Sequence, residues 1–257
     1  MDLGLSGRRA LVAAGSRGLG RASAEALLAE GARVAICGRD RDPLQAAASE
    51  IGAVPIVADV STVEGALGLV QGGAEALGGC EILVPNSGGP PTARFGDLGD
   101  DDWQAAFELL LRSWARMIRA ALPHMRAAGY GRVVGIGSSA MKQPIPNLIL
   151  SNALRAGVAG MLRTLADEIA PEGITVNVVL PGRILTDRVR FMARDRSARS
   201  GRPEEDELRA IAGDIPMGRI GDPADVGAMV AYLASERAAY VTGAFVAVDG
   251  GLYRGLF

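Results

Sequence analysis

The chain has 257 residues, of which 49% are hydrophobic, and a formal net charge of −2. This length suits one large α/β domain with a well-buried core, and the near-neutral charge argues against a nucleic-acid-binding surface and against disorder. No apolar run reaches the length needed to cross a bilayer, and the start "MDLGLSGRRALVAAG" carries no export signal, so we expect a cytoplasmic protein.

In chain order, the predicted strands are the stretches 9–15, 33–39, 54–60, 81–88, 131–139, 174–182 and 244–251. Most are continuous apolar runs, as expected for strands buried on both faces of a parallel sheet. Helical patterns alternate with them, for example over 20–32, 102–125 and 151–173. This order predicts an α/β fold with an open, doubly wound parallel sheet of about seven strands, helices on both faces, and a single domain over 1–257. The charged segment 187–215 interrupts the alternation, and we expect it to form a helical lid.

Two residue types limit the chemistry. Cys37 and Cys80 stand alone, without the spacing of metal ligands, which predicts reduced thiols and no metal site. His124, the only histidine, lies in the far part of a long predicted helix, and we interpret it as structural. Of the 27 basic residues a single one, Lys142, is lysine.

A glycine-rich loop follows the first strand directly and leads into a helix. It reads "AAGSRGLGRASAEALLAEG", with glycines at 15, 18 and 20. Such glycines let the backbone turn tightly and approach a pyrophosphate, which then lies at a helix N-terminus. In this strand–loop–helix context the motif predicts nucleotide binding.

With these motifs the sequence resembles the short-chain dehydrogenase/reductase family over essentially the entire chain, especially its 3-oxoacyl-carrier-protein-reductase-like branch. The matching pieces are the loop around Gly18-Leu19-Gly20, Asp59-Val60 after the third strand, "PNSG" at 85–88, "PGRILT" at 181–186 and the ending "VTGAFVAVDGG". In the loop, Ala14 stands where the family has its first glycine. The resemblance implies a Rossmann-type fold and a cofactor site made of Ala14, Ser16, Arg17, Gly18, Leu19, Gly20, Arg39, Asp59, Val60, Asn86, Ser87, Gly88, Arg155, Pro181, Gly182, Ile184 and Thr186.

The charge at the end of the second strand indicates which nicotinamide cofactor binds. NAD sites usually place a carboxylate there to bind the ribose hydroxyls. Here the strand ends in Cys37-Gly38-Arg39, and Arg17 in the glycine loop offers a second guanidinium. Two guanidiniums suit a 2′-phosphate, which predicts NADP(H) rather than NAD(H). The alternative is that both are solvated surface arginines.

The catalytic positions depart from the family pattern. The resemblance implies that Ser138 binds the substrate oxygen. Thirteen residues later the family's proton-donating tyrosine is replaced by Ser151, and four residues beyond that its lysine is replaced by Arg155. The position of its asparagine, which holds a relay water, aligns with Leu110. The usual proton relay is therefore absent.

The single lysine offers one replacement for the missing acid. Lys142 follows Ser138 by four residues, in a loop whose backbone Pro144 and Pro146 restrict. We hypothesise that burial, or a neighbouring cation such as Arg155, lowers its pKa enough for it to donate a proton, while Ser138 and Ser151 bind the substrate oxygen. The alternatives are an exposed loop lysine with no catalytic role, and bound water as the proton source.

Three interpretations of function follow. The first is an NADP(H)-dependent oxidoreductase acting on a small carbonyl or alcohol substrate, 3-oxoacyl-like or another ketone, with a non-standard proton donor. The others are a catalytically impaired nucleotide-binding sensor or scaffold, and a repurposed lyase or isomerase. The resemblance also implies a homo-oligomer, tetramer or dimer. Arginines at 188, 190, 194, 196, 199 and 202 could receive an anionic or carrier-linked substrate, or form a solvated face balanced by the acidic run 204–207.

Overall fold

A parallel sheet of seven strands forms the centre of the computed structural model, which describes residues 1–256. The strand order is β3-β2-β1-β4-β5-β6-β7, and every neighbouring pair is parallel. The strands are β1 (Arg9–Val12), β2 (Arg33–Gly38), β3 (Val54–Val57), β4 (Ile82–Val84), β5 (Gly131–Ile136), β6 (Ile174–Pro181) and β7 (Phe245–Val248). This arrangement confirms the predicted fold class. The chain reverses its direction of travel between β3 and β4, so the topological switch point lies between β1 and β4, where open α/β sheets bind ligands.

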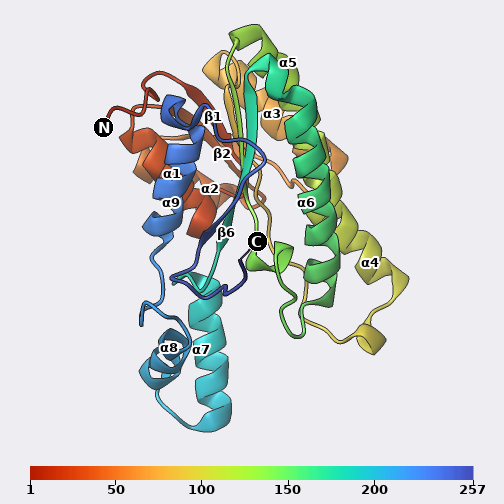
Figure 1. The fold of residues 1–257 in the computed structure, drawn as a ribbon, viewed down its shortest axis with the longest axis vertical. Helices are drawn as coiled ribbons and strands as arrows, with labels where there is room; N and C mark the ends of the chain where they lie inside the picture. The colour runs from red at the N-terminus through yellow and green to blue at the C-terminus, as the bar shows by residue number, and fades with distance from the viewer. Residues whose placement is uncertain (257) are drawn as a thin grey trace.

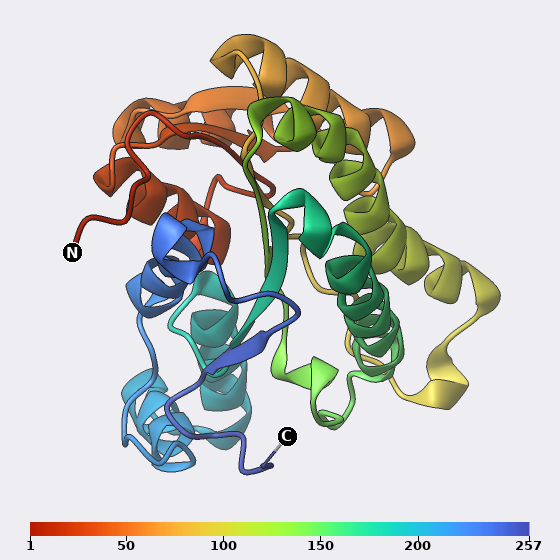
Figure 2. The ribbon, with the colours of Figure 1, turned by 45° about the horizontal axis from the view of Figure 1, so that its top comes forward.

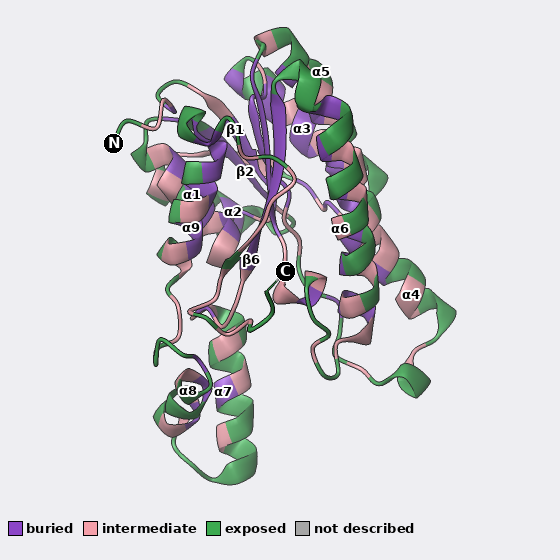
Figure 3. Ribbon diagram, in the orientation of Figure 1, coloured by how far each residue is buried: buried purple, intermediate pink, exposed green. Residues whose placement is uncertain are grey.

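Helices cover both faces of the sheet and enclose two hydrophobic cores (Figure 2). One face carries α1 (Gly18–Ala29), α2 (Arg41–Ile51) and α9 (Pro223–Ala234), and the other carries α3 (Val63–Leu77), α5 (Ser113–Ala128) and α6 (Ile149–Ile169). The inner strands β1, β2, β4, β5 and β6 are almost entirely buried (Figure 3), which explains their continuous apolar runs, whereas the edge strands β3 and β7 are only partly buried.

Three of the predicted elements that border the site have boundaries that differ from the prediction. The strands predicted over 9–15 and 81–88 end at Val12 and Val84, because the glycine-containing residues that follow leave the sheet as loops. The helix predicted over 102–125 is in fact α4 (Asp100–Phe107), a π-helical turn η2 (Glu108–Arg112) and α5.

The segment 187–215 folds as two helices, α7 (Asp187–Ser200) and α8 (Glu204–Gly213), which pack against each other. They extend beyond the body of the molecule at the end of the sheet where β6 finishes (Figure 1). Their surface is largely exposed (Figure 3). This position is compatible with the expected lid.

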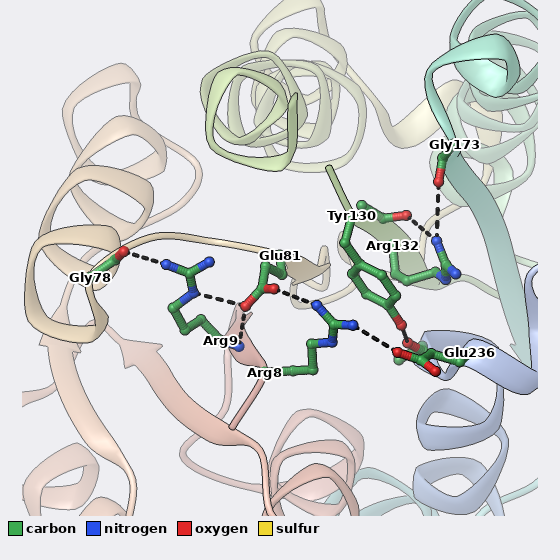
Figure 4. Close-up of polar contacts among 10 residues, drawn as sticks. Arg8, Arg9, Gly78, Glu81, Tyr130, Arg132, Gly173 and Glu236 are labelled. Carbon is green, nitrogen blue, oxygen red and sulfur yellow. Dashed lines mark hydrogen bonds and ion pairs between the residues drawn. The ribbon is translucent and has the colours of Figure 1, made fainter. Parts of the chain in front are cut away.

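A charged cluster closes the opposite, amino-terminal edge of the sheet (Figure 4). The buried carboxylate of Glu81 accepts hydrogen bonds from Nη1 of Arg8 at 2.8 Å and from Nε and N–H of Arg9 at 2.8 and 3.1 Å. The guanidiniums of Arg8 and Arg132 lie 3.9 and 4.1 Å from the ring centroid of Tyr130. The cluster joins the N-terminal ends of β1, β4 and β5. The candidate functional site lies at the opposite edge, where these strands end.

Within residues 1–256, no helix combines the length and apolar character that crossing a membrane requires. Cys37 and Cys80 are free and buried, in agreement with the predicted reduced thiols. Burial raises the pKa of both thiols to about 12, so neither is a nucleophile at neutral pH.

Candidate functional site

The glycine loop is fixed to the strands on both sides of it. The N–H of Ala13 donates to the carbonyl of Val84 at 3.0 Å, and the N–H of Gly15 donates to the carbonyl of Cys37 at 2.8 Å. Nδ2 of Asn86 donates to the carbonyl of Ala13 at 3.3 Å. The loop therefore lies at the switch point with its position set by β2 and β4.

The glycines are there because the backbone comes close to itself. A Cβ on Gly20 would lie 2.3 Å from the carbonyl oxygen of Ala14, which no side chain tolerates. Ala14 itself has φ 48°, the left-handed region that its family counterpart, a glycine, adopts without strain. Arg17, at the N-cap of α1, makes no side-chain capping bond, so the first N–H groups of this helix remain available to an anion.

The residues predicted to hold the adenosine half of a dinucleotide lie along the carboxyl ends of β2 and β3. Ser16 packs against Gly38, since its Oγ is 3.3 Å from the position of a Cβ there. Asp59 follows β3, and its Oδ1 accepts hydrogen bonds from the N–H and Oγ of Ser61 at 3.0 and 2.7 Å. Arg17 and Arg39 are exposed, and neither guanidinium is paired with a carboxylate in residues 1–256.

Further predicted residues lie after β4 and β6. Oγ of Ser87 is buried without a hydrogen-bond partner in the described chain. After β6, a Cβ on Gly182 would lie 2.5 Å from Cβ of Asp249, so glycine is required where this segment crosses the end of β7. Ile184 is buried, and Thr186 forms the N-cap of α7 without a side-chain capping bond.

Three of the four candidate catalytic residues, Ser138, Ser151 and Arg155, come from one loop and one helix. Ser138 lies two residues after the end of β5 and is the N-cap of the 3-10 turn η3 (Ser139–Met141), where its Oγ accepts a hydrogen bond from the N–H of Ala140 at 3.1 Å. Ser151 and Arg155 are buried in the first two turns of α6, and η3 packs against this helix. Because they are four residues apart, Ser151 and Arg155 lie on one face of α6.

Arg155 is a buried guanidinium with an unsatisfied donor. It is 8% exposed, and its Nε has no hydrogen-bond partner in residues 1–256. Burial lowers the pKa of Arg155 to about 10, with the nearby Arg188 guanidinium acting in the same direction. It nevertheless stays charged at neutral pH. With Ser87 it leaves two buried polar atoms for a bound molecule, and this fits a dinucleotide lying along the edge.

Leu110, at the position where the family has the asparagine that holds a relay water, lies in the π-helical turn η2. Leu110 is 1% exposed within η2, and η2 packs against α6. Its side chain has no hydrogen-bonding group, so it cannot hold a water. π-Helical turns are frequent at functional sites, which accords with the position of this one beside Ser151 and Arg155.

Lys142 is not buried, so that premise of the lysine hypothesis is wrong. It is exposed at the end of η3, with its ammonium 5.2 Å from the ring centroid of Tyr253, in the C-terminal tail. Sequence reasoning missed Asn152, which orders the loop: its Nδ2 donates to the carbonyl of Ile145 at 2.9 Å and its Oδ1 accepts from the N–H of Ile145 at 3.0 Å. This role of Asn152 could have been suspected from the sequence, because Asn152 is next to Ser151 and closely follows a loop that contains two prolines.

His124, half-buried on α5, lies outside this site. Among residues 1–256 no group of three histidine, cysteine, aspartate or glutamate side chains is arranged to hold a metal ion.

Comparisons with known proteins agree with this geometry. A family model described as enoyl-(acyl carrier protein) reductase matches residues 13–253. The 3-oxoacyl-[acyl-carrier-protein] reductase FabG of Escherichia coli (strain K12) is 34% identical over 256 residues, covering 98% of this chain and 99% of its own. Nodulation protein G of Rhizobium sp. (strain N33) is 35% identical over 250 residues, covering 96% and 98%.

Solved structures extend the likeness to the whole fold. L-sorbose reductase from Gluconobacter frateurii, complexed with NADPH and L-sorbose, superposes with a TM-score of 0.96 at 31% identity over 100% of both chains. An actinorhodin polyketide ketoreductase variant with NADPH superposes with a TM-score of 0.89 at 32% identity, over 95% of this chain and 97% of its own.

A glycine loop at the switch point of a seven-stranded parallel sheet, with a buried basic residue on α6, defines a dinucleotide-dependent oxidoreductase fold. The chain belongs to the short-chain dehydrogenase/reductase family, within the group that the enoyl-(acyl carrier protein) reductase model describes.

Proposed function

We propose that this protein is an NADPH-dependent reductase that transfers hydride to a carbonyl group of a small molecule and works without a tyrosine acid. The observation that carries the proposal is the carboxyl edge of the sheet. There the glycine loop, Oγ of Ser87 and Nε of Arg155 are the groups that we expect a dinucleotide to contact, since both side-chain atoms are buried without a hydrogen-bond partner in the described chain. Two similar structures are NADPH complexes, which supports the choice of cofactor.

The proposed contacts divide between the two ends of the cofactor. The free N–H groups at the start of α1 bind the pyrophosphate, and Arg17 and Arg39 bind the 2′-phosphate. Asp59 and Val60 hold the adenine, while Asn86, Ser87 and Gly88 border the ribose. Pro181, Gly182, Ile184 and Thr186 surround the carboxamide, and Arg155 takes the lysine's place at the nicotinamide ribose.

The chemistry of hydride transfer belongs to the bound nicotinamide, and the chain's own residues orient the carbonyl and stabilise its oxygen. In this proposal the hydroxyls of Ser138, at the N-cap of η3, and of the buried Ser151 donate hydrogen bonds to that oxygen. The positive charge of Arg155, close by on the same helix face, stabilises the developing alkoxide. An aliphatic hydroxyl is a much weaker acid than a phenol. The proton therefore comes from elsewhere, and loss of a general acid typically lowers the rate by about 10²- to 10⁴-fold.

Lys142 and bound water are the two candidate proton sources. If Lys142 donates, the tail must carry Tyr253 away from it so that the ammonium turns toward Ser138. Lys142→Arg keeps the charge but removes the titratable amine, so turnover falls at least tenfold with NADPH affinity unchanged if lysine is the donor. Full activity in this variant assigns the role to water.

We further propose a cytoplasmic homo-oligomer, a tetramer or dimer, on the likeness to the family, and a lid formed by 187–215. A monomer by light scattering contradicts the first statement. The alternative function, a nucleotide-binding sensor or scaffold, is favoured by the apolar Leu110 and the short Ser151 in place of the relay.

A cofactor titration combined with a substrate panel tests the proposal. NADPH binds more tightly than NADH, and Arg39→Ala lowers NADPH affinity about tenfold or more while NADH affinity stays unchanged, because one phosphate contact is lost. Arg119→Ala, an exposed arginine on α5, is the matched control. Equal binding of both cofactors contradicts the NADPH assignment. Tight NADPH binding without oxidation by any ketone or quinone supports the sensor instead.

A further inference from the structure

A buried positive charge near the reaction site lacks an anion. The guanidinium of Arg155 is 8% exposed, its Nε is unsatisfied, and no carboxylate forms an ion pair with it in residues 1–256. A buried unpaired charge is costly, and natural proteins keep one chiefly where a bound molecule supplies the partner. Arg155 has five N–H donors, whereas the lysine that the family has at this position has three. Donors therefore remain on Arg155 after the ribose hydroxyls are bound.

A second guanidinium reaches the same region from α7. Nη1 of Arg188 lies 2.5 Å from the position of a Cβ on Gly89, so the guanidinium rests on the loop that follows Ser87 and Gly88. Arg188 is close enough to Arg155 to contribute to its lowered pKa. Asp187 precedes Arg188, but it is exposed and pairs with neither arginine in the described chain. Arg188 is exposed as well, and in the described chain neither guanidinium forms an ion pair with a carboxylate.

The start of α7 adds to this positive field. The helix has 14 residues, and its N-cap Thr186 makes no side-chain capping bond. The first free N–H groups of a helix favour an anion, and this end lies in the same turn as Arg188. The two guanidiniums and the helix end together form what we call the Arg155–Arg188 subsite.

The cofactor's own anions have other partners. In the proposed function its 2′-phosphate lies at Arg17 and Arg39 beside β2, and its pyrophosphate lies at the start of α1. The Arg155–Arg188 subsite lies at the nicotinamide end, where the substrate must bind. Ser151 is several atoms shorter than the family's tyrosine, so the side chain at this position does not extend as far along the helix face that carries Arg155.

We propose that the Arg155–Arg188 subsite binds a carboxylate of the substrate, so that the preferred substrates are small oxo acid anions rather than neutral ketones. This inference rests on the proposed function, because it names the substrate class of that reductase. Carboxylate and guanidinium match in charge and in bidentate geometry, and the subsite orients the neighbouring carbonyl toward Ser138.

The test compares each acid with its neutral ester. Pyruvate, acetoacetate and levulinate place the carbonyl at increasing distances from the carboxylate, and their methyl esters remove the charge. The wild-type protein reduces at least one acid with kcat/KM at least tenfold above its ester. Arg188→Ala lowers this acid-to-ester ratio at least tenfold, chiefly through KM, while Arg190→Ala leaves it unchanged. Arg190 is the matched control, an exposed arginine on α7 without a side-chain partner in residues 1–256.

Two results overturn the inference. The first is an acid-to-ester ratio near one for all three pairs. The second is a loss of NADPH affinity in Arg188→Ala as large as the loss in turnover, which assigns the subsite to a cofactor phosphate. If no substrate is reduced, the proposed function fails. The inference is then decided by calorimetry on the NADP⁺-loaded protein, where binding of an acid but not of its ester supports it and equal binding overturns it.

Discussion

Replacing Ser151 by tyrosine tests how much of the reaction machinery remains. Ser151 is 6% exposed and lies one helical turn before the buried Arg155. A phenol at this position would have a guanidinium on the same helix face, at a Cβ separation of roughly 6 Å. If the phenolate and the guanidinium are also about 6 Å apart, their attraction at an effective dielectric constant of about 20 is about 2.8 kcal/mol. This attraction acts to lower the phenol pKa from its usual value of about 10, while burial acts to raise it, as it does for Tyr130 between Arg8 and Arg132.

Ser151→Tyr therefore supplies an acid that is protonated at neutral pH. We expect kcat for ketone reduction to rise by about 10²- to 10⁴-fold, the usual contribution of a general acid. Reduction requires the protonated phenol, so this gain falls as the pH rises through the pKa of the introduced tyrosine. Steady-state oxidation of NADPH measured across pH gives both quantities.

Ser151→Phe is the matched control, since it has the same ring without the hydroxyl. Thermal denaturation of both variants checks that the ring is accommodated in this buried place. Equal rates for Ser151→Tyr and Ser151→Phe would refute the reasoning, because the remaining serine and arginine would then not form a site that a phenol completes.

The remaining predictions concern stability. Glu81→Gln lowers the free energy of unfolding, measured by urea denaturation, by about 2–4 kcal/mol, because the carboxylate between Arg8 and Arg9 is buried. The control is Glu236→Gln, at a half-exposed partner of Arg8, which lowers it by about 1 kcal/mol or less. Burial alone would raise the pKa of Glu81, but the hydrogen bonds from Arg9 and Arg8 lower this pKa overall. The ionised carboxylate therefore stabilises the fold fully above about pH 4.3, the pKa of an unfolded glutamate, and this stabilisation is lost as the pH falls through the folded-state pKa. A Glu81→Gln variant with an unchanged acid limb of the stability profile contradicts this. Ala14→Gly stabilises the protein by up to about 1 kcal/mol, since glycine relieves a left-handed backbone, and a clear loss of stability would contradict the strain argument.

The sheet was predictable because its strands are short, continuously apolar and separated by helical patterns. The hydrophobicity pattern did not predict the residue at which each strand ends. Val12 and Val84 end their strands although apolar or small residues follow, since the loops beyond them are held by contacts between distant segments, such as that of Asn86 with Ala13. Local hydrophobicity carries no information about such pairings.

The site was predicted in part. The glycine loop and the Ser138, Ser151 and Arg155 positions come from spacing within single segments, and the structure places the last three on one loop and the helix beside it. Lys142 was judged by its distance along the chain from Ser138, which cannot reveal that its side chain turns toward the C-terminal tail. The approach of Arg188 to Arg155 joins segments 33 residues apart, and no spacing rule relates them.

Deuterium transfer tests the central claim most directly. NADPH carrying deuterium at the transferable position of the nicotinamide is incubated with the protein and the panel of ketones and oxo acids, and the alcohols formed are examined by mass spectrometry. The account predicts an alcohol with a single deuterium on the carbinol carbon, formed from one face of the nicotinamide only, and lost when NADPH binding is abolished. Tight binding of NADPH without deuterium in any product would contradict it, and would make this chain a nucleotide-binding protein that has kept the fold of a reductase.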